Sequence, residues 1–251
     1  MVDEASVEQR KGLSAITAVL PRPKALLARR LVAQARIGCG EFVPDQVADD
    51  FHRMGLTLSP VELGLLEEWL AKGLHTSVCE ETRSSDGTVK LLLQLEDGKK
   101  VETVAMPVGA CCVSSQVGCA VGCKFCASGL FGVERHLTTD EIVEQVVHAR
   151  RQMPIDRVVY MGMGEPSHNL DNVLTAVARM KDELMISPRR QTLSTVGGVK
   201  PLEKMMAAEV RPCLALSLHT ADEAKRSELL PRAHKDPLRD IVAAADAYGR
   251  E

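Results

Sequence analysis

The chain has 251 residues, which is enough for one large domain with a small appendage. Its 31 basic and 34 acidic side chains give a formal charge of −3, so an RNA site would have to be a local patch. Aromatic residues make up only 3 % of the chain, which argues against an RNA surface built on rows of stacked rings.

No apolar stretch is long enough to predict a transmembrane helix, and the first twelve residues show no signal-peptide pattern. We therefore expect a cytoplasmic protein with no membrane partner. In a reducing cytosol, clustered cysteines bind metal or carry out chemistry more often than they form structural disulfides, and this chain has eight cysteines.

Residues 1–85 predict a small helical domain. Its segment 21–36 carries five basic side chains and no acidic one, with leucines at helical spacing. Two interpretations are open, a helix that grips RNA phosphates and a solvated basic face on an ordinary surface helix. A second helix is predicted from Ser59 to Lys72, because Pro60 suits a first helical turn.

Residues 86–251 predict an α/β core. A β-hairpin turning at Asp97-Gly98 comes first, and strands and helices then alternate. This alternation predicts a parallel sheet or partial (β/α) barrel, with functional residues just past the carboxyl ends of its strands. The strands are expected at 111–117, 157–161, 191–195 and 213–219, and the helices at 138–151, 171–184, 202–208, 221–230 and 237–248.

A cysteine motif follows the first of these strands. Cys119, Cys123 and Cys126 have the spacing C-x-x-x-C-x-x-C on a short loop that contains glycine. Three thiolates can bind three irons of a cubane iron–sulfur cluster and leave the fourth iron open for a substrate. The competing interpretation is zinc, but structural zinc sites usually add a second ligand pair elsewhere in the sequence.

The cysteine motif, the aromatic Phe125 within it, and the later strings GMGEP, LSTVGG and SLH resemble the radical S-adenosylmethionine superfamily. Together they are similar to the RlmN/Cfr type of RNA adenine-C-methyltransferases over roughly residues 101–238. The resemblance implies a partial (β/α) barrel of the radical-SAM type. It also implies a [4Fe–4S] cluster and S-adenosylmethionine as cofactors, which together yield a 5′-deoxyadenosyl radical.

The resemblance also implies a set of cofactor-binding residues at the ends of the predicted strands. Ser217 and His219 lie two residues apart, so we expect them on one face of their strand. An isolated histidine in this place would more often make a structural hydrogen bond. The implied contacts with S-adenosylmethionine are Gly164, Glu165, Ser194, Ser217, Leu218 and His219.

Two further residues match catalytic positions of the family. Glu102 matches a glutamate that accepts a proton during methyl transfer, and Cys112 matches a cysteine that resolves the protein–RNA adduct through a transient disulfide. Because neighbouring strand residues point to opposite faces, only one of Cys111 and Cys112 can face the active site, and we expect Cys112. The remaining cysteines outside the motif are predicted to be packing residues; they are Cys39, Cys79 and Cys213.

The family also carries a methyl group on a cysteine near its C-terminus, whereas no cysteine follows Cys213 in this sequence. We expect the sequence to be a fragment of a full methyltransferase. The alternatives are a shortened enzyme with altered chemistry and an inactive remnant that binds RNA or cofactor.

The leading hypothesis is a radical methyltransferase that acts on an adenine ring carbon, C2, of 23S ribosomal RNA, with tRNA as a second substrate. The expected partners are this RNA and an electron-donating reductant, and the chain is expected to be a monomer. The alternatives are a cluster-containing RNA-binding remnant without methyl transfer and a radical enzyme with another substrate.

Overall fold

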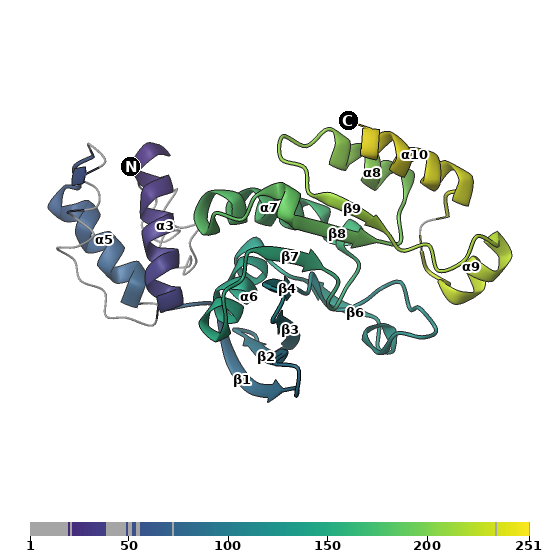
Figure 1. Cartoon of the computed structure of the whole chain (residues 1–251), viewed down its shortest axis with the longest axis horizontal. Coiled ribbons are helices and arrows are strands. Elements are labelled where there is room, and N and C mark those ends of the chain that lie inside the picture. Colours follow the sequence, from purple (N-terminus) through teal and green to yellow (C-terminus); the bar gives the residue numbers. More distant parts are fainter. Residues whose placement is uncertain are drawn as a thin grey trace.

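The computed structural model describes residues 20, 22–38, 49, 52–53, 56–71, 73–233 and 235–250. Its centre is a mixed sheet with the strand order β1-β2-β3-β4-β7-β8-β9 (Figure 1). A separate two-stranded sheet pairs β5 with β6. The strands are β1 (Thr76–Arg83), β2 (Val89–Leu95), β3 (Lys100–Met106), β4 (Ala110–Cys112), β5 (Gln116–Gly118), β6 (Val133–His136), β7 (Arg157–Tyr160), β8 (Gln191–Thr195) and β9 (Cys213–Leu216).

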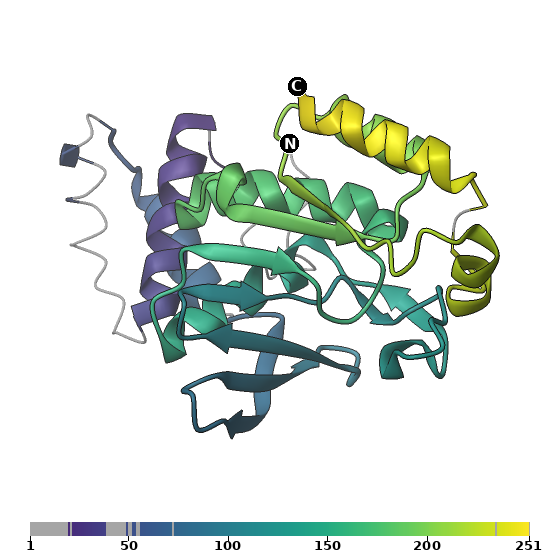
Figure 2. The same ribbon diagram turned by 45° about the vertical axis from the view of Figure 1, so that its right-hand side comes forward.

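Strands β1 to β4 form an antiparallel meander, and β4, β7, β8 and β9 are parallel. Helices α6 (Thr139–Gln152) and α7 (Leu170–Leu184) connect the parallel strands, as do α8 (Val199–Met206) and short 3-10 turns. After β9 the chain forms α9 (Glu223–Leu229) and α10 (Leu238–Arg250), and α10 packs beside α8 (Figure 2). The predicted partial barrel is confirmed.

The two faces of the sheet differ in burial. One face is fully buried, and its residues include Ala105, Cys111, Val158 and Leu193. The other face is only half-buried and carries polar groups. Because directly paired residues share a face, the register aligns on it Glu102, Val104, Cys112, Val159, Thr192 and Ser194.

Local sequence signals explain where the principal helices begin. The Thr138 hydroxyl accepts from the Glu141 N–H and the Glu141 carboxylate accepts from the Thr138 N–H, which makes a capping box at the start of the helix predicted at 138–151. The helix α5 (Pro60–Ala71) starts after a similar pair, in which the Ser59 N–H donates to Glu62 Oε2 at 2.7 Å. The predicted helix from residue 59 is thereby confirmed. None of the described helices is both long enough and apolar enough to cross a membrane.

The basic segment forms the helix α3 (Arg22–Gly38), which packs against α7. Arg29 forms an ion pair with Glu183 at 3.1 Å, and Lys24 forms one with Glu62 at 2.9 Å. Arg30 donates a hydrogen bond to a backbone carbonyl of α7. These three side chains therefore contact other parts of the protein rather than forming a fully solvated face, and the RNA-binding role of the segment stays a prediction.

Two expectations about strands need correction. The stretch 111–117 is not one strand, because the Ser115 N–H donates to Met163 O at 2.8 Å and the chain leaves β4 before β5 begins. Strand β1 lies inside the range 1–85 that was predicted to be helical, and it pairs with β2. The division of the chain into two domains stays a prediction.

Candidate functional site

The loop with the three motif cysteines is held closed by its own backbone. It starts directly after β5, and the Cys119 N–H donates to Gly132 O at 3.0 Å. Within the loop, the Cys126 N–H donates to Cys123 O, also at 3.0 Å. The three cysteines therefore project from one small, internally hydrogen-bonded loop.

Gly118 is required at the entrance to this loop. Its φ of +76° is a left-handed conformation, and a Cβ added there would lie 2.1 Å from the carbonyl oxygen of Gly132. That oxygen is the acceptor which closes the loop. A glycine at this position is thus a geometric condition for the arrangement of the cysteines.

The thiols lie close enough to influence one another. Burial raises the pKa of Cys123 to about 11, with further contributions from Cys119 and Cys126. Burial also raises the pKa of Cys119, although its sulfur accepts hydrogen bonds from the backbone N–H groups of Val121 and Gly122. Such N–H groups stabilise a thiolate once a metal has displaced the proton.

This donor set fits an iron–sulfur cluster. Among the described residues, no three histidine, cysteine or acidic side chains are placed to hold one metal ion. A cubane cluster needs no such convergence, because each thiolate binds a different iron. Cys119, Cys123 and Cys126 would be its protein ligands.

Glu165 lies at the carboxyl end of β7 and is 4 % exposed. Its Oε1 accepts hydrogen bonds from the N–H of Ser167 (3.0 Å) and the hydroxyl of Thr195 (2.5 Å), and its Oε2 accepts one from the N–H of Val196 (3.1 Å). A carboxylate offers about four acceptor positions, so one remains for a ligand such as an ammonium group. The negative charge of Glu165 also acts on Cys119 and Cys123, which places the carboxylate beside the cysteine loop.

The other predicted cofactor residues gather at the same edge of the sheet. Gly164 approaches β5 so closely that a Cβ on it would lie 2.6 Å from the Cβ of Gln116. Ser194, in β8, lies on the half-buried face, and its hydroxyl is 2.8 Å from that of Ser217. Leu218 follows Ser217 and is half-buried.

His219 does not lie on the strand, contrary to the expectation that it shares a strand face with Ser217. Strand β9 ends at Leu216, and His219 has a left-handed φ of 64°. This turn brings its ring to 4.8 Å from the ring of Phe125, measured between centroids. The strand-end segment thus contacts the cysteine loop directly.

Glu102 and Cys112 share the half-buried face of the sheet. Cys112 pairs with Val104, two residues along β3 from Glu102, whereas Cys111 points into the core on the other face. Glu102 is partly exposed and forms an ion pair with Lys90 at 3.0 Å. The structure therefore places Cys112, rather than Cys111, on the face that carries Ser194, and the catalytic roles of both residues stay predictions.

Sequence reasoning missed a residue that positions Glu165. Gln116 is fully buried, its Oε1 accepts from the Glu165 N–H at 2.8 Å, and its Nε2 lies 2.9 Å from His136 Nδ1. The sequence carried no signal for this role, because Ser114 and Ser115 in the same stretch are polar too. Thr195, which donates to Glu165, was missed for the same reason.

The expectation that Cys79 and Cys213 are packing residues is wrong, because both are exposed. Their thiols donate only to nearby carbonyls, those of Leu92 and Arg189. Every cysteine within the described part of the chain is a free thiol, so no disulfide is seen there. Cys39 lies outside the described residues.

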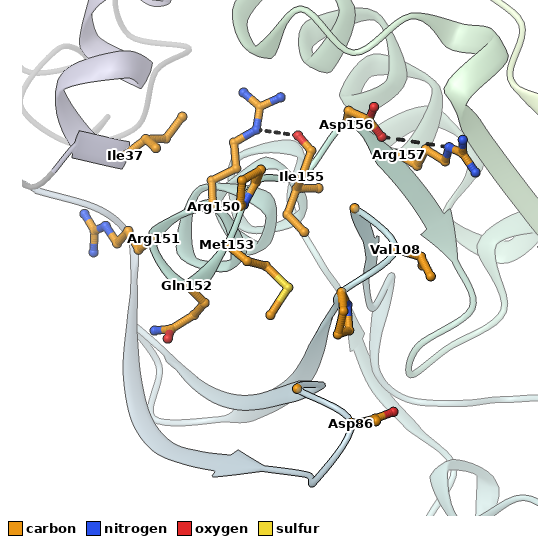
Figure 3. A pocket seen from close by; sticks show the side chains of 14 residues that line it. Ile37, Asp86, Val108, Arg150, Arg151, Gln152, Met153, Ile155, Asp156 and Arg157 are labelled. Carbon is orange, nitrogen blue, oxygen red and sulfur yellow. Dashed lines mark hydrogen bonds and ion pairs between the residues drawn. The ribbon is translucent and has the colours of Figure 1, made fainter.

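A cavity of about 1030 Å³ lies at the opposite end of the parallel strands (Figure 3). Ile37 of α3, the turn around Val108 and the end of α6 surround it. Arg150 donates there to Ile155 O at 3.0 Å. None of the predicted site residues lines this cavity, so it is separate from the candidate site.

Comparisons with known proteins agree with this geometry. A family model described as "Radical SAM superfamily" matches residues 113–251. A radical SAM methyltransferase from Sphaerobacter thermophilus, solved by crystallography, superposes with a TM-score of 0.75 at 31 % sequence identity, over 94 % of this chain and 70 % of that one.

Two curated bacterial proteins, each named "Probable RNA methyltransferase", are also similar. The protein from Stutzerimonas stutzeri (strain A1501) is 43 % identical over 205 residues, which are 82 % of this chain and 58 % of that protein. The one from Thiobacillus denitrificans is 45 % identical over 205 residues, covering 82 % of this chain and 55 % of the relative. The chain thus spans little more than half the length of these relatives.

Proposed function

Because the chain belongs to the radical SAM superfamily, we propose that it acts as an RNA methyltransferase that modifies an adenine ring carbon. Membership of this superfamily means that its cofactors are a [4Fe–4S] cluster and S-adenosylmethionine. The observation that carries the proposal is the convergence of the cysteine loop with Glu165, Ser194 and His219 at one edge of the sheet. The names of the curated relatives support RNA as the substrate.

The residues of the cysteine loop hold the cluster when it is bound. With S-adenosylmethionine the cluster supplies a 5′-deoxyadenosyl radical, which suits an adenine ring carbon because such a carbon is a poor nucleophile. Glu165 accepts a hydrogen bond from the cofactor's ammonium group at its remaining acceptor position. Gly164, Ser194, Ser217, Leu218 and His219 contact the rest of S-adenosylmethionine.

Two residues on the half-buried face act on the RNA side of the reaction. Glu102 accepts the proton that the adenine carbon loses when a methyl group replaces its hydrogen. Cys112 would release the methylated RNA by forming a disulfide with the methyl-carrying cysteine of the family, which has no counterpart after Cys213 in this sequence. The support for Cys112 is its position on the face shared with Glu102 and Ser194, because Cys111 points away from that face.

We propose that the substrate is 23S ribosomal RNA, modified at adenine C2, with tRNA as a second substrate. An external reductant supplies electrons to the cluster, and the cytoplasm, where these RNAs occur, is the place of action. The alternatives are a cluster-containing protein that binds RNA without methylating it and a radical enzyme that acts on another substrate.

The test supplies the anaerobically reconstituted chain with dithionite, methyl-labelled S-adenosylmethionine and unmodified 23S ribosomal RNA transcript. The expected result is 5′-deoxyadenosine together with label in adenosine after the RNA is digested to nucleosides. RNA binding without label would favour the RNA-binding alternative. Release of 5′-deoxyadenosine without RNA binding would favour another substrate.

A further inference from the structure

A second, smaller cavity lies at the edge of the sheet that carries the candidate site. Its volume is about 570 Å³, within the range of pockets that hold small ligands or parts of large ones. It lies between the start of α7, the helix α8 and the segment before α10. The residues that line it are Ser167, His168, Leu170, Asp171, Lys200, Pro201, Lys204, Lys235 and Asp236.

The wall of this cavity is tied to the candidate cofactor site. Ser167 lines the cavity, and its N–H donates to Glu165 Oε1 at 3.0 Å. On the other side, Glu165 Oε2 accepts from Val196 in the segment that leads from β8 into α8. One carboxylate therefore contacts both Ser167, which lines the cavity, and the segment that leads into α8.

The cavity is lined by more positive than negative side chains. Lys204 forms an ion pair with Asp171 at 2.6 Å, and Asp236 accepts a hydrogen bond from the Val199 N–H at 2.9 Å. Both carboxylates are therefore engaged. Among the described residues, Lys200 and Lys235 have neither an ion pair nor a hydrogen bond through their ammonium groups.

Several other cations among the described residues are paired with carboxylates. Lys99 forms an ion pair with Glu134, and Lys124 forms one with Glu228. Arg135 is shared between Asp97 and Glu141. An incoming anion would have to compete with a carboxylate at each of these side chains, but not at Lys200 or Lys235.

We propose that this cavity binds a backbone phosphate of the RNA substrate, next to the nucleotide that enters the catalytic site. The inference rests on the proposed function, because it takes RNA as the substrate. Lys200 and Lys235 supply the charge that the phosphodiester needs, and the volume leaves room for the adjoining ribose. Such a contact positions RNA without reading its sequence.

The experiment measures binding of 23S ribosomal RNA transcript to the reconstituted full chain at several salt concentrations. The double variant Lys200→Ala/Lys235→Ala is compared with wild type and with a control, Lys181→Ala/Arg189→Ala. The control removes the same charge at the end of α7 and before β8, at the far end of the parallel strands. Iron content and thermal unfolding of both variants verify that they fold and load the cluster.

We expect the cavity variant to bind RNA more weakly and to flatten the plot of log K against log salt concentration by about 1, because a phosphate contact is lost. The control should change neither slope nor affinity beyond the effect of net charge. Identical behaviour of the two variants would overturn the phosphate site and leave the proposed function intact.

If wild type itself binds no RNA, the proposed function fails and this site fails with it. A titration with inorganic pyrophosphate distinguishes a small phosphorylated ligand. Pyrophosphate binding that is lost in the cavity variant, while RNA affinity stays at the level of the control, would also overturn the inference.

Discussion

Glu165 shows how much one buried residue can organise in this site. Its carboxylate accepts three hydrogen bonds from the segments after β7 and β8, and its backbone N–H donates to Gln116 of β5. A buried charge is tolerated only when it is hydrogen-bonded in this way. The residue expected to touch the cofactor therefore also fixes the ends of three strands.

Cys112 and Cys111 are adjacent, and they should differ sharply when replaced. We expect Cys112→Ala to keep its cluster and to release 5′-deoxyadenosine while losing methylated RNA, because only the resolving thiol is missing. Cys111 is fully buried, so Cys111→Ser should instead lower the free energy of unfolding by about 1–3 kcal/mol, by placing a hydroxyl in the apolar core. Analysis of the reaction products tests Cys112→Ala, and denaturant unfolding tests Cys111→Ser. Unchanged RNA methylation by Cys112→Ala would contradict the resolving role of Cys112.

The site was predictable from sequence where chemistry-bearing residues sit in short motifs. The cysteine spacing, Glu165 after a strand and Ser194 at a strand end all carried such a signal. Gln116 and Thr195 did not, because their roles are to hold Glu165 through contacts 49 and 30 residues distant in sequence. The turn at His219 was also missed, since nothing in the sequence indicates that β9 ends three residues earlier.

At the scale of elements, the cysteine loop depends on Gly118, and the chain offers a matched control. Gly132 has almost the same φ, +77°, but a Cβ added there would meet nothing within 4 Å. Gly132→Ala should therefore cost only the backbone strain of about 1–2 kcal/mol. Gly118→Ala adds a clash with the Gly132 carbonyl and should cost clearly more, with loss of bound iron. Equal unfolding free energies and iron contents for the two variants would contradict this role.

A buried polar cluster attaches β1 to α6. Glu144 accepts hydrogen bonds from the N–H groups of His75 (3.1 Å) and Thr76 (2.9 Å), and the Thr76 hydroxyl lies 3.0 Å from His148 Nε2. Burial raises the pKa of Glu144 to about 7 and lowers that of His148 to about 4. Protons therefore affect the stability of this junction.

The direction in which stability depends on pH follows from the raised pKa of Glu144. The folded state holds the proton more tightly than the unfolded state, so the contribution of Glu144 is complete below about pH 4.5 and is lost as the pH rises through 7. Glu144→Gln cannot titrate, and its destabilisation relative to wild type should be larger at pH 5 than at pH 7, by about 2 kcal/mol. Denaturant unfolding at the two pH values measures the difference. If Glu144→Gln lowered the free energy of unfolding equally at the two pH values, the raised pKa of Glu144 would be contradicted.

The elements that sequence predicted well had strong local signals. The helix predicted at 138–151, which begins with a capping box, and the strand predicted at 191–195 are found at or within one residue of the expected positions. Strand β1 was missed because seven of its eight residues are exposed, so it shows no alternation of apolar and polar residues. Strand β6 has only four residues and no buried one, and its pairing with β5 depends on the cysteine loop between them.

At the scale of the whole molecule, buried ion pairs connect the N-terminal helix to the core. Glu183 of α7 accepts from Arg179 at 2.8 Å and pairs with Arg29 of α3 at 3.1 Å. Arg179 in turn contacts Asp140 of α6 at 2.7 Å. Three helices thus share one network of charges beside the sheet.

Removing the charge of Glu183 should destabilise the fold. The largely buried guanidinium groups of Arg29 and Arg179 would then lack the carboxylate with which they both pair. We expect Glu183→Gln to lower the free energy of unfolding by about 3–5 kcal/mol and to increase hydrogen exchange in α3. Glu203→Gln, on the exposed side of α8, is the control and should have little effect. Unchanged exchange in α3 for Glu183→Gln would show that the helix is held by other contacts.

The central claim is that Cys119, Cys123 and Cys126 hold a [4Fe–4S] cluster that works with S-adenosylmethionine. The most direct measurement determines iron, and 5′-deoxyadenosine released with dithionite and S-adenosylmethionine, for the anaerobically purified chain and its Cys123→Ala variant. We predict about four irons per chain and release of 5′-deoxyadenosine for wild type, with both lost in the variant while Cys213→Ala keeps them. Zinc without iron in the wild-type chain, or iron that survives in Cys123→Ala, would contradict the account.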